Sequence, residues 1–153
     1  MLILNIMYKN IIQFVVMFLT GILFNPMNIL AYRLNDLYLS KTLMYGGLLM
    51  ASNMIWSHEI VHYLAMNHFN SKLFIFGIIL SIIISQFLLR DQFNITDKDW
   101  LERMISHHST ALTTSEKIRE RTKNKRIKKL ADDIFKLQDK EISLMKQYLS
   151  NSF

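Results

Sequence analysis

Two imidazoles and a thioether lie close together in the last third of the chain. Met104 precedes the pair His107 and His108 by about one helical turn, so a helix through this segment places all three side chains near one face. Methionine sulfur combined with imidazole nitrogen is a ligand set that suits copper, above all Cu(I). The spacing therefore predicts a transition-metal site on this helix, with copper as the preferred ion.

A second group of donor side chains follows on the next predicted helix. Gln138, Glu141 and Met145 are spaced three and four residues apart and so share one face. An antiparallel hairpin would bring Glu141 and Met145 against the histidine pair, where they could complete or orient the ligand set. Two histidines with a glutamate would suit zinc or iron, which makes zinc the less favoured ion. In the alternative interpretation the same residues only close a helix interface and bind no metal, because methionine commonly fills cores.

A separate constellation occurs earlier in the chain. His58-Glu59-x-x-His62 fits the pattern in which two histidines one helical turn apart bind zinc and the glutamate polarises water. His68 stands at the spacing of a third ligand, but Ala65 occupies the position where such proteases need a glycine. We therefore expect no enzyme, and keep these residues as a secondary candidate for a membrane metal or proton-linked site. The alternative is that they lie at headgroup level, where titratable groups are ordinary.

The elements that position these residues fall into two chemically different halves. The chain is 51% hydrophobic, yet only four of its 18 Lys and Arg residues precede Arg90. Three apolar stretches, at about 11–32, 42–66 and 73–89, are long enough to cross a hydrocarbon core of about 30 Å as helices. Residues 1–90 are thus predicted to form a membrane domain with three transmembrane helices, with the lipid bilayer as its partner.

Residues 96–150 are predicted to form a water-soluble helical hairpin. Thr96 can cap the first helix, and the turn is expected near Lys123 to Lys125. Apolar residues on the second helix recur three and four apart, with Glu141 within the series: Ile127, Leu130, Ile134, Leu137, Leu144 and Tyr148. Since two helices alone leave such a stripe exposed, we expect the hairpin to pack against a partner, preferably another copy in a homo-oligomer.

Charge suggests where the hairpin lies. The net charge of +6 on a chain with membrane spans indicates contact with lipid headgroups, and no nucleic-acid partner is expected. Short-loop Lys and Arg residues near 33–41 and 90–103 outnumber those on the opposite side, so the positive-inside rule predicts a cytoplasmic hairpin. The chain has no cysteine, which leaves neither a disulfide nor a thiolate metal site.

The motifs of the hairpin also resemble a known family. Met104-Ile-Ser-His-His108, then Ser115-Glu116, Leu130-Ala-Asp132 and Gln138-x-x-Glu-Ile-x-x-Met145 are similar to the domain of unknown function 305 family. The three spans and the exit Leu89-Arg90-x-Gln92 also look like its membrane-anchored members. The chain departs from the family at Ser106, where proline is usual, and in carrying one two-helix unit where many members have two.

The resemblance implies a ferritin-like architecture built from two-helix repeats, with a metal-binding role for the His-His pair. The expected fold is therefore all-α: three transmembrane helices followed by a ferritin-like hairpin, half of a four-helix bundle. Many members are secreted or periplasmic, which opposes the orientation predicted from charge. The expected function is metal binding at a membrane surface, and the alternative is a structural or interaction protein without metal.

Overall fold

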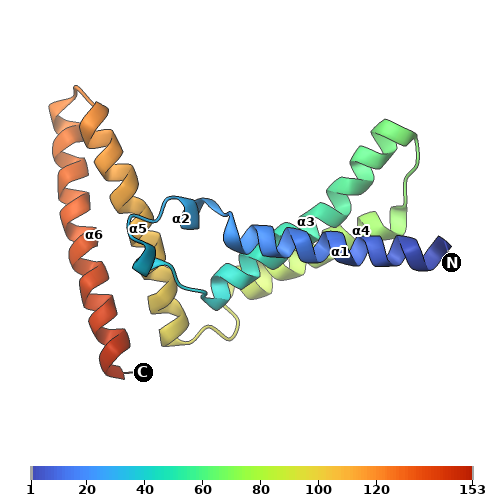
Figure 1. The fold of residues 1–153 in the computed structure, drawn as a ribbon, viewed down its shortest axis with the longest axis horizontal. Coiled ribbons are helices and arrows are strands. Elements are labelled where there is room, and N and C mark those ends of the chain that lie inside the picture. Colours follow the sequence, from blue (N-terminus) through green and yellow to red (C-terminus); the bar gives the residue numbers. More distant parts are fainter. Residues whose placement is uncertain (1, 153) are drawn as a thin grey trace. The chain divides into compact units, whose positions relative to one another are not determined.

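The computed structural model describes residues 2–152, and all regular structure within that range is helical. The all-α class is thus confirmed. Figure 1 follows the chain through its elements, and contacts divide it into two units, unit 1 (residues up to 23 and 42–94) and unit 2 (24–41 and from 95 on). The elements are α1 (Leu2–Leu23), α2 (Pro26–Ile29), η1 (Leu34–Asp36), α3 (Lys41–Met66), α4 (Ser71–Ile83), the π-helical η2 (Ile84–Arg90), α5 (Asp97–Arg121) and α6 (Lys125–Ser152).

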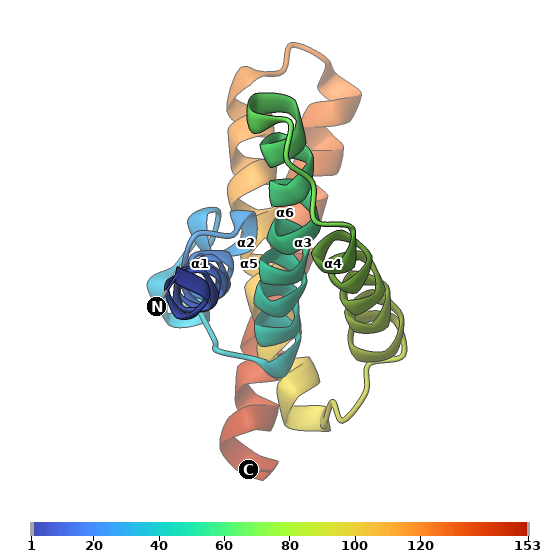
Figure 2. The ribbon, with the colours of Figure 1, turned by 90° about the vertical axis from the view of Figure 1, so that its right-hand side faces the viewer.

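Unit 1 is built from helices that approach one another through small residues, with α3 between α1 and α4 (Figure 2). A Cβ added to Gly21 of α1 would lie 3.0 Å from the Cα of Gly47 in α3. A Cβ on Gly77 of α4 would lie 2.9 Å from the backbone nitrogen of Trp56 in α3. Glycine is needed at both crossings because a side chain there would push the backbones apart.

Large apolar side chains of unit 1 face outward. Two stretches, Asn10–Ile29 and Ser71–Arg90, are long and apolar enough to cross a membrane, and only 11% of each is buried. The sequence predicted three such spans, and α3 is the one that does not qualify. From Asn53 onward it carries polar groups, among them His58 and Glu59, which lower its hydropathy.

The first apolar stretch is not one continuous helix. α1 ends at Leu23, and the side chain of Asn25 then caps the short α2 by accepting hydrogen bonds from the backbone nitrogens of Met27 and Asn28, at 3.0 and 3.1 Å. Pro26 occupies the first position of α2, where its missing N–H costs nothing. The helix is thus broken at Asn25-Pro26, after which the chain joins unit 2.

Unit 2 contains the two longest charged helices, α5 and α6, which pack side by side and run in opposite directions (Figure 1). Thr96 begins α5 with a capping box, in which its hydroxyl accepts from the backbone nitrogen of Asp99 while the Asp99 carboxylate accepts from Thr96. The core between the helices consists of Leu101, Ile105, Leu112, Ile142 and Met145. Residues 24–41, called here the crossing segment, pack against α5 through α2 and η1.

Candidate functional site

One of the two adjacent histidines faces across the hairpin. His108 Nε2 of α5 lies 3.5 Å from Glu141 Oε2 of α6, with 13% and 42% of the two side chains exposed. Because α5 and α6 are antiparallel, the position one turn before His108 on α5 and the position one turn after Glu141 on α6 lie at the same level of the hairpin. Those positions hold Met104 and Met145, which both contact the buried core. The hairpin therefore places four of the five side chains predicted as ligands along the interface between α5 and α6, with a contact between His108 and Glu141.

His107 is the exception. Its side chain is exposed, and its ring is 5.9 Å from that of His108 at an angle of 72°. Successive residues on a helix are turned by about 100°, so two adjacent histidines cannot both face the same neighbour. The arrangement separates His107 from the carboxylate of Glu141 and leaves His108 as the imidazole inside the hairpin.

The surroundings of His108 favour its neutral form. Burial lowers the pKa of His108, as does the nearby His107, whereas the carboxylate of Glu141 acts in the opposite direction. The buried Nδ1 atom of His108 and the buried Oε1 atom of Gln138, on the facing helix, have no hydrogen-bond partner in the described range. Buried polar atoms of this kind are usually satisfied by an ordered water or an ion.

The His-His-Glu set that zinc or iron would use is not assembled. Residues 2–152 contain no group of three or more His, Cys, Asp or Glu side chains placed to hold a metal ion. What the hairpin does place together is one imidazole, one carboxylate and two thioethers. Thioethers suit soft ions, so this donor set differs from the set of a zinc site.

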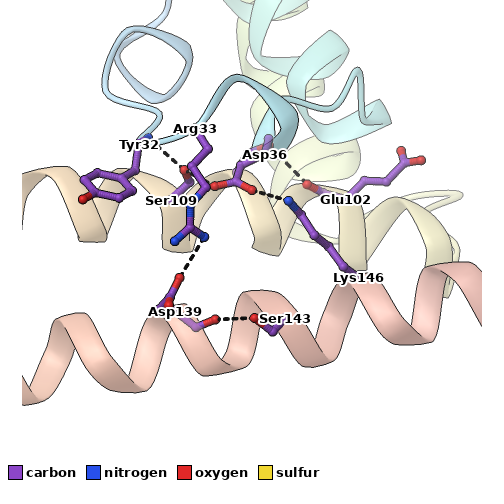
Figure 3. A network of polar contacts seen from close by, with 9 residues as sticks. Tyr32, Arg33, Asp36, Glu102, Ser109, Asp139, Ser143 and Lys146 are labelled. Carbon is purple, nitrogen blue, oxygen red and sulfur yellow. Dashed lines mark hydrogen bonds and ion pairs between the residues drawn. The ribbon is translucent and has the colours of Figure 1, made fainter.

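A buried carboxylate in the crossing segment was not anticipated from the sequence. Asp36 is completely buried, and its Oδ1 lies 2.5 Å from Lys146 Nζ of α6, while Ser109 Oγ of α5 donates to Oδ2 at 2.7 Å (Figure 3). Ser106 Oγ donates to the backbone oxygen of Asp36 at 2.8 Å. The carboxylate thus ties the crossing segment to both helices of the hairpin.

Further polar contacts hold the same segment. Arg33 forms an ion pair with Asp139 of α6 at 2.8 Å, and the backbone nitrogen of Tyr32 donates to Ser109 Oγ at 2.8 Å (Figure 3). At the end of the crossing segment, Lys41 Nζ forms an ion pair with Asp99 Oδ2 at 2.9 Å. Arg33 and Lys41, counted as loop charges when the orientation was predicted, are therefore partners within unit 2.

Ser106, where the resembling family usually has proline, has a structural role. Proline at that position would have no side-chain donor for the crossing segment, whereas the serine hydroxyl provides one. Ser106, Ser109 and Ser115 are all buried on α5. Small polar residues three or six positions apart on a helix are the signal that could have indicated close approach of another segment.

The second candidate site is arranged differently from a zinc-protease motif. The rings of His58 and His62 are 4.7 Å apart, and those of His62 and His68 are 6.1 Å apart. Glu59 is buried, and its Oε2 accepts a hydrogen bond from the backbone nitrogen of Asn70 at 2.9 Å. Glu59 thus anchors the turn between α3 and α4. It also lines, with His58, an open cavity of about 420 Å³ whose walls come from α1, α3 and α4.

These features define an all-helical protein with two apolar helices of membrane-spanning length and a charged antiparallel hairpin. Residues 88–149 match the family described as domain of unknown function (DUF305). An uncharacterized protein of Acanthamoeba polyphaga mimivirus is 38% identical over 133 residues, which cover 86% of this chain and 85% of the viral protein. The chain therefore belongs to the family of that viral protein and carries the DUF305 match in its last part. No solved structure matches the chain.

Proposed function

We propose that the chain is a multi-pass membrane protein that holds the hairpin at one membrane face. The supporting observation is that unit 2 combines two distant segments of the chain. Asp36, in the segment between α1 and α3, is buried against Ser109 and Lys146, which follow α4 in the sequence. If only α1 and α4 crossed the bilayer, Asp36 and Lys146 would lie on opposite sides. Their contact supports a further crossing by α3, and we therefore propose three spans.

The packing of unit 1 explains how the more polar α3 can cross. Its Ser52 hydroxyl is 3.0 Å from the Ser81 hydroxyl of α4, and Asn53 accepts a hydrogen bond from the indole of Trp56 at 3.1 Å. Polar groups satisfied inside a bundle are tolerated at membrane depth. The outer helices instead expose large apolar side chains, such as Val16, which is 53% exposed. Lipid is the solvent that such a surface fits.

Site-specific labelling tests this topology, because the chain has no cysteine of its own. Leu34→Cys, Asn124→Cys and Asn67→Cys would be probed with a membrane-impermeant maleimide in sealed vesicles. Three crossings predict that positions 34 and 124 react from one side and position 67 only from the other. Reaction of all three from the same side would contradict the proposal. Labelling of position 124 from the cytoplasmic side would also test the cytoplasmic location of the hairpin, which we propose from the positive-inside rule.

We infer that the hairpin is an interaction and assembly domain. The motif residues serve helix packing: Met145 and Ile142 are buried in its core, and Glu141 pairs with His108 across the interface. These contacts need no ion to hold the two helices together. The domain would then act by presenting the outer surface of α6 at the membrane.

Copper binding is the second candidate, favoured by the buried and unpartnered Nδ1 of His108. His108, Met104 and Met145 would supply one imidazole and two thioethers, a set that fits Cu(I), with Glu141 orienting the imidazole. His107 is exposed and lies outside this set.

Metal analysis of the purified chain separates the two functions. After loading with Cu(I), mass spectrometry of the native chain, His108→Ala and the matched control His107→Ala would measure bound copper. Copper binding predicts about one ion in the native chain and in the His107 variant, and loss in the His108 variant. Equal copper in all three, or none in any, would leave the interaction domain as the function.

A further inference from the structure

The outer surface of α6 carries an apolar stripe that is left exposed by the parts of unit 2 within residues 24–41 and 95–152. The face toward α5 is occupied by Ala131, Ile142 and Met145, which are all buried. The stripe lies beside that face and contains six apolar residues. Five of them are 42–55% exposed, namely Ile127, Leu130, Leu137, Leu144 and Tyr148, and the sixth, Ile134, is half-buried. Together with Glu141, which lies between Leu137 and Leu144, they are spaced alternately three and four residues apart, as in a coiled-coil seam.

The two ends of the stripe differ in shape. At the end near the turn, Ile127, Leu130 and Ile134 line a groove of about 300 Å³ together with residues of α5. At the other end, Leu144 and Tyr148 are exposed, 44% and 51% respectively. Leu130 and Leu144 are fourteen positions apart, which corresponds to about 21 Å along a helix. A copy placed in the opposite direction would bring protruding side chains to the groove, and two-fold symmetry would do so twice.

The charges beside the stripe favour the same direction. Asp133 and Lys140 are both exposed, and each directly precedes a seam position, Ile134 and Glu141. In an antiparallel pair, Asp133 of one copy comes near Lys140 of the other, again twice. In a parallel pair in register, Glu141 would meet Glu141 within an apolar seam, which is unfavourable because like charges repel.

We propose that α6 binds a second copy of this chain in antiparallel orientation, with Ile134 of each copy against Leu137 of the other. Two hairpins then form a four-helix bundle whose central interface is the paired stripe. The inference rests on the assembly role proposed above and specifies its partner, its direction and its register.

Disulfide cross-linking of the full chain in detergent tests the direction. Two differently tagged variants, Ile127→Cys and Leu144→Cys, would be mixed and mildly oxidised. The antiparallel arrangement predicts a covalent product that carries both tags, because position 127 faces position 144 of the second copy. Products of each variant with itself only would show a parallel pair and overturn the proposal. Absence of any product, with the mass of a monomer in solution, would overturn it as well.

Charge reversal tests the register by a different measurement. Asp133→Lys and Lys140→Asp each place two like-charged pairs at the interface, and each should weaken dimerisation about tenfold. The double variant restores both pairs and should dimerise like the native chain. Lys129→Asp makes the same charge change as Lys140→Asp, but on the exposed face of α6 away from the stripe, and serves as its control. Equal affinities for all four variants would contradict the register.

The two proposals fail in distinguishable ways. Labelling in vesicles reports whether α3 crosses the membrane, whereas cross-linking in detergent reports only on α6. A chain with three spans that stays monomeric would retain the membrane topology and lose the dimer. A lipid-attached quencher that reached a probe at Leu137→Cys would show that the stripe contacts the membrane, and it too would overturn the dimer.

Discussion

The ion pair between Asp36 and Lys146 makes an asymmetric prediction. Asp36 has no exposed surface, whereas 30% of the Lys146 side chain is exposed. Lys146→Met would leave a carboxylate buried without its cation, while Asp36→Asn would leave an ammonium group that can turn toward water. We therefore expect the lysine substitution to cost more free energy of unfolding than the aspartate substitution.

The magnitudes follow from the contacts of each group. Breaking a buried ion pair so that one charge stays uncompensated costs about 3–5 kcal/mol. Because Ser109 still donates to the carboxylate in Lys146→Met, we expect the lower end, about 3 kcal/mol. In Asp36→Asn the amide oxygen can still accept from Ser109, so the loss is that of one charge-assisted hydrogen bond, about 1.5–2 kcal/mol. The double variant should resemble Asp36→Asn, since no buried charge remains to be destabilised, giving a coupling of about 3 kcal/mol.

Hydrogen exchange followed by mass spectrometry measures these effects on the full-length protein in detergent. Peptides from α5 and α6 report the opening of unit 2, and their protection should fall in the order native, Asp36→Asn, Lys146→Met. Peptides from α4 serve as an internal control, because neither substitution touches unit 1. A uniform change across the whole chain would indicate general unfolding.

Two results would refute the reasoning. If Asp36→Asn cost as much as Lys146→Met or more, the difference in exposure would not govern the energetics. If both single variants changed protection by less than about 0.5 kcal/mol, the range of ordinary surface substitutions, then the crossing segment would not be held by this pair.

Three further predictions concern single positions. Gly77→Ala should destabilise unit 1 by about 1–3 kcal/mol, because the added Cβ would lie 2.9 Å from the backbone nitrogen of Trp56. Gly46→Ala should be tolerated, because no atom of the described residues lies within 4 Å of the Cβ that it adds. Thermal unfolding of the two variants measures the difference. Burial raises the pKa of Asp99, but the hydrogen bonds from Thr96 and Lys41 outweigh that effect and lower the pKa to about 2. As the pH falls, the unfolded state therefore takes up this proton before the folded state does. Stability worth about 1–2 kcal/mol, after discounting solvent screening, should be present above pH 4 and lost toward pH 2, and Asp99→Asn should abolish that dependence. Burial lowers the pKa of His108, so the unfolded state binds that proton more readily and unit 2 should lose stability as the pH falls below about 6.5. Unfolding of His108→Gln should lack this component, and an unchanged pH profile would contradict the burial argument.

The sequence by itself determined the features that depend on local periodicity. The runs of apolar residues in α1 and α4, the cap at Thr96 and the break at Asn25-Pro26 are all set by neighbours within a few positions. The helical spacing also placed Met104, His108 and Glu141 on facing surfaces, because a short turn between α5 and α6 leaves the helices few ways to pack.

Only the tertiary structure decided which groups are buried. Periodicity could not choose between His107 and His108, since the choice depends on which side of α5 meets α6. Asp36 appeared to be an ordinary loop carboxylate, yet it is fully buried against Lys146, 110 positions away. Contacts at such separation depend on how whole helices and the crossing segment pack, and pairwise spacing along a chain carries no record of that packing.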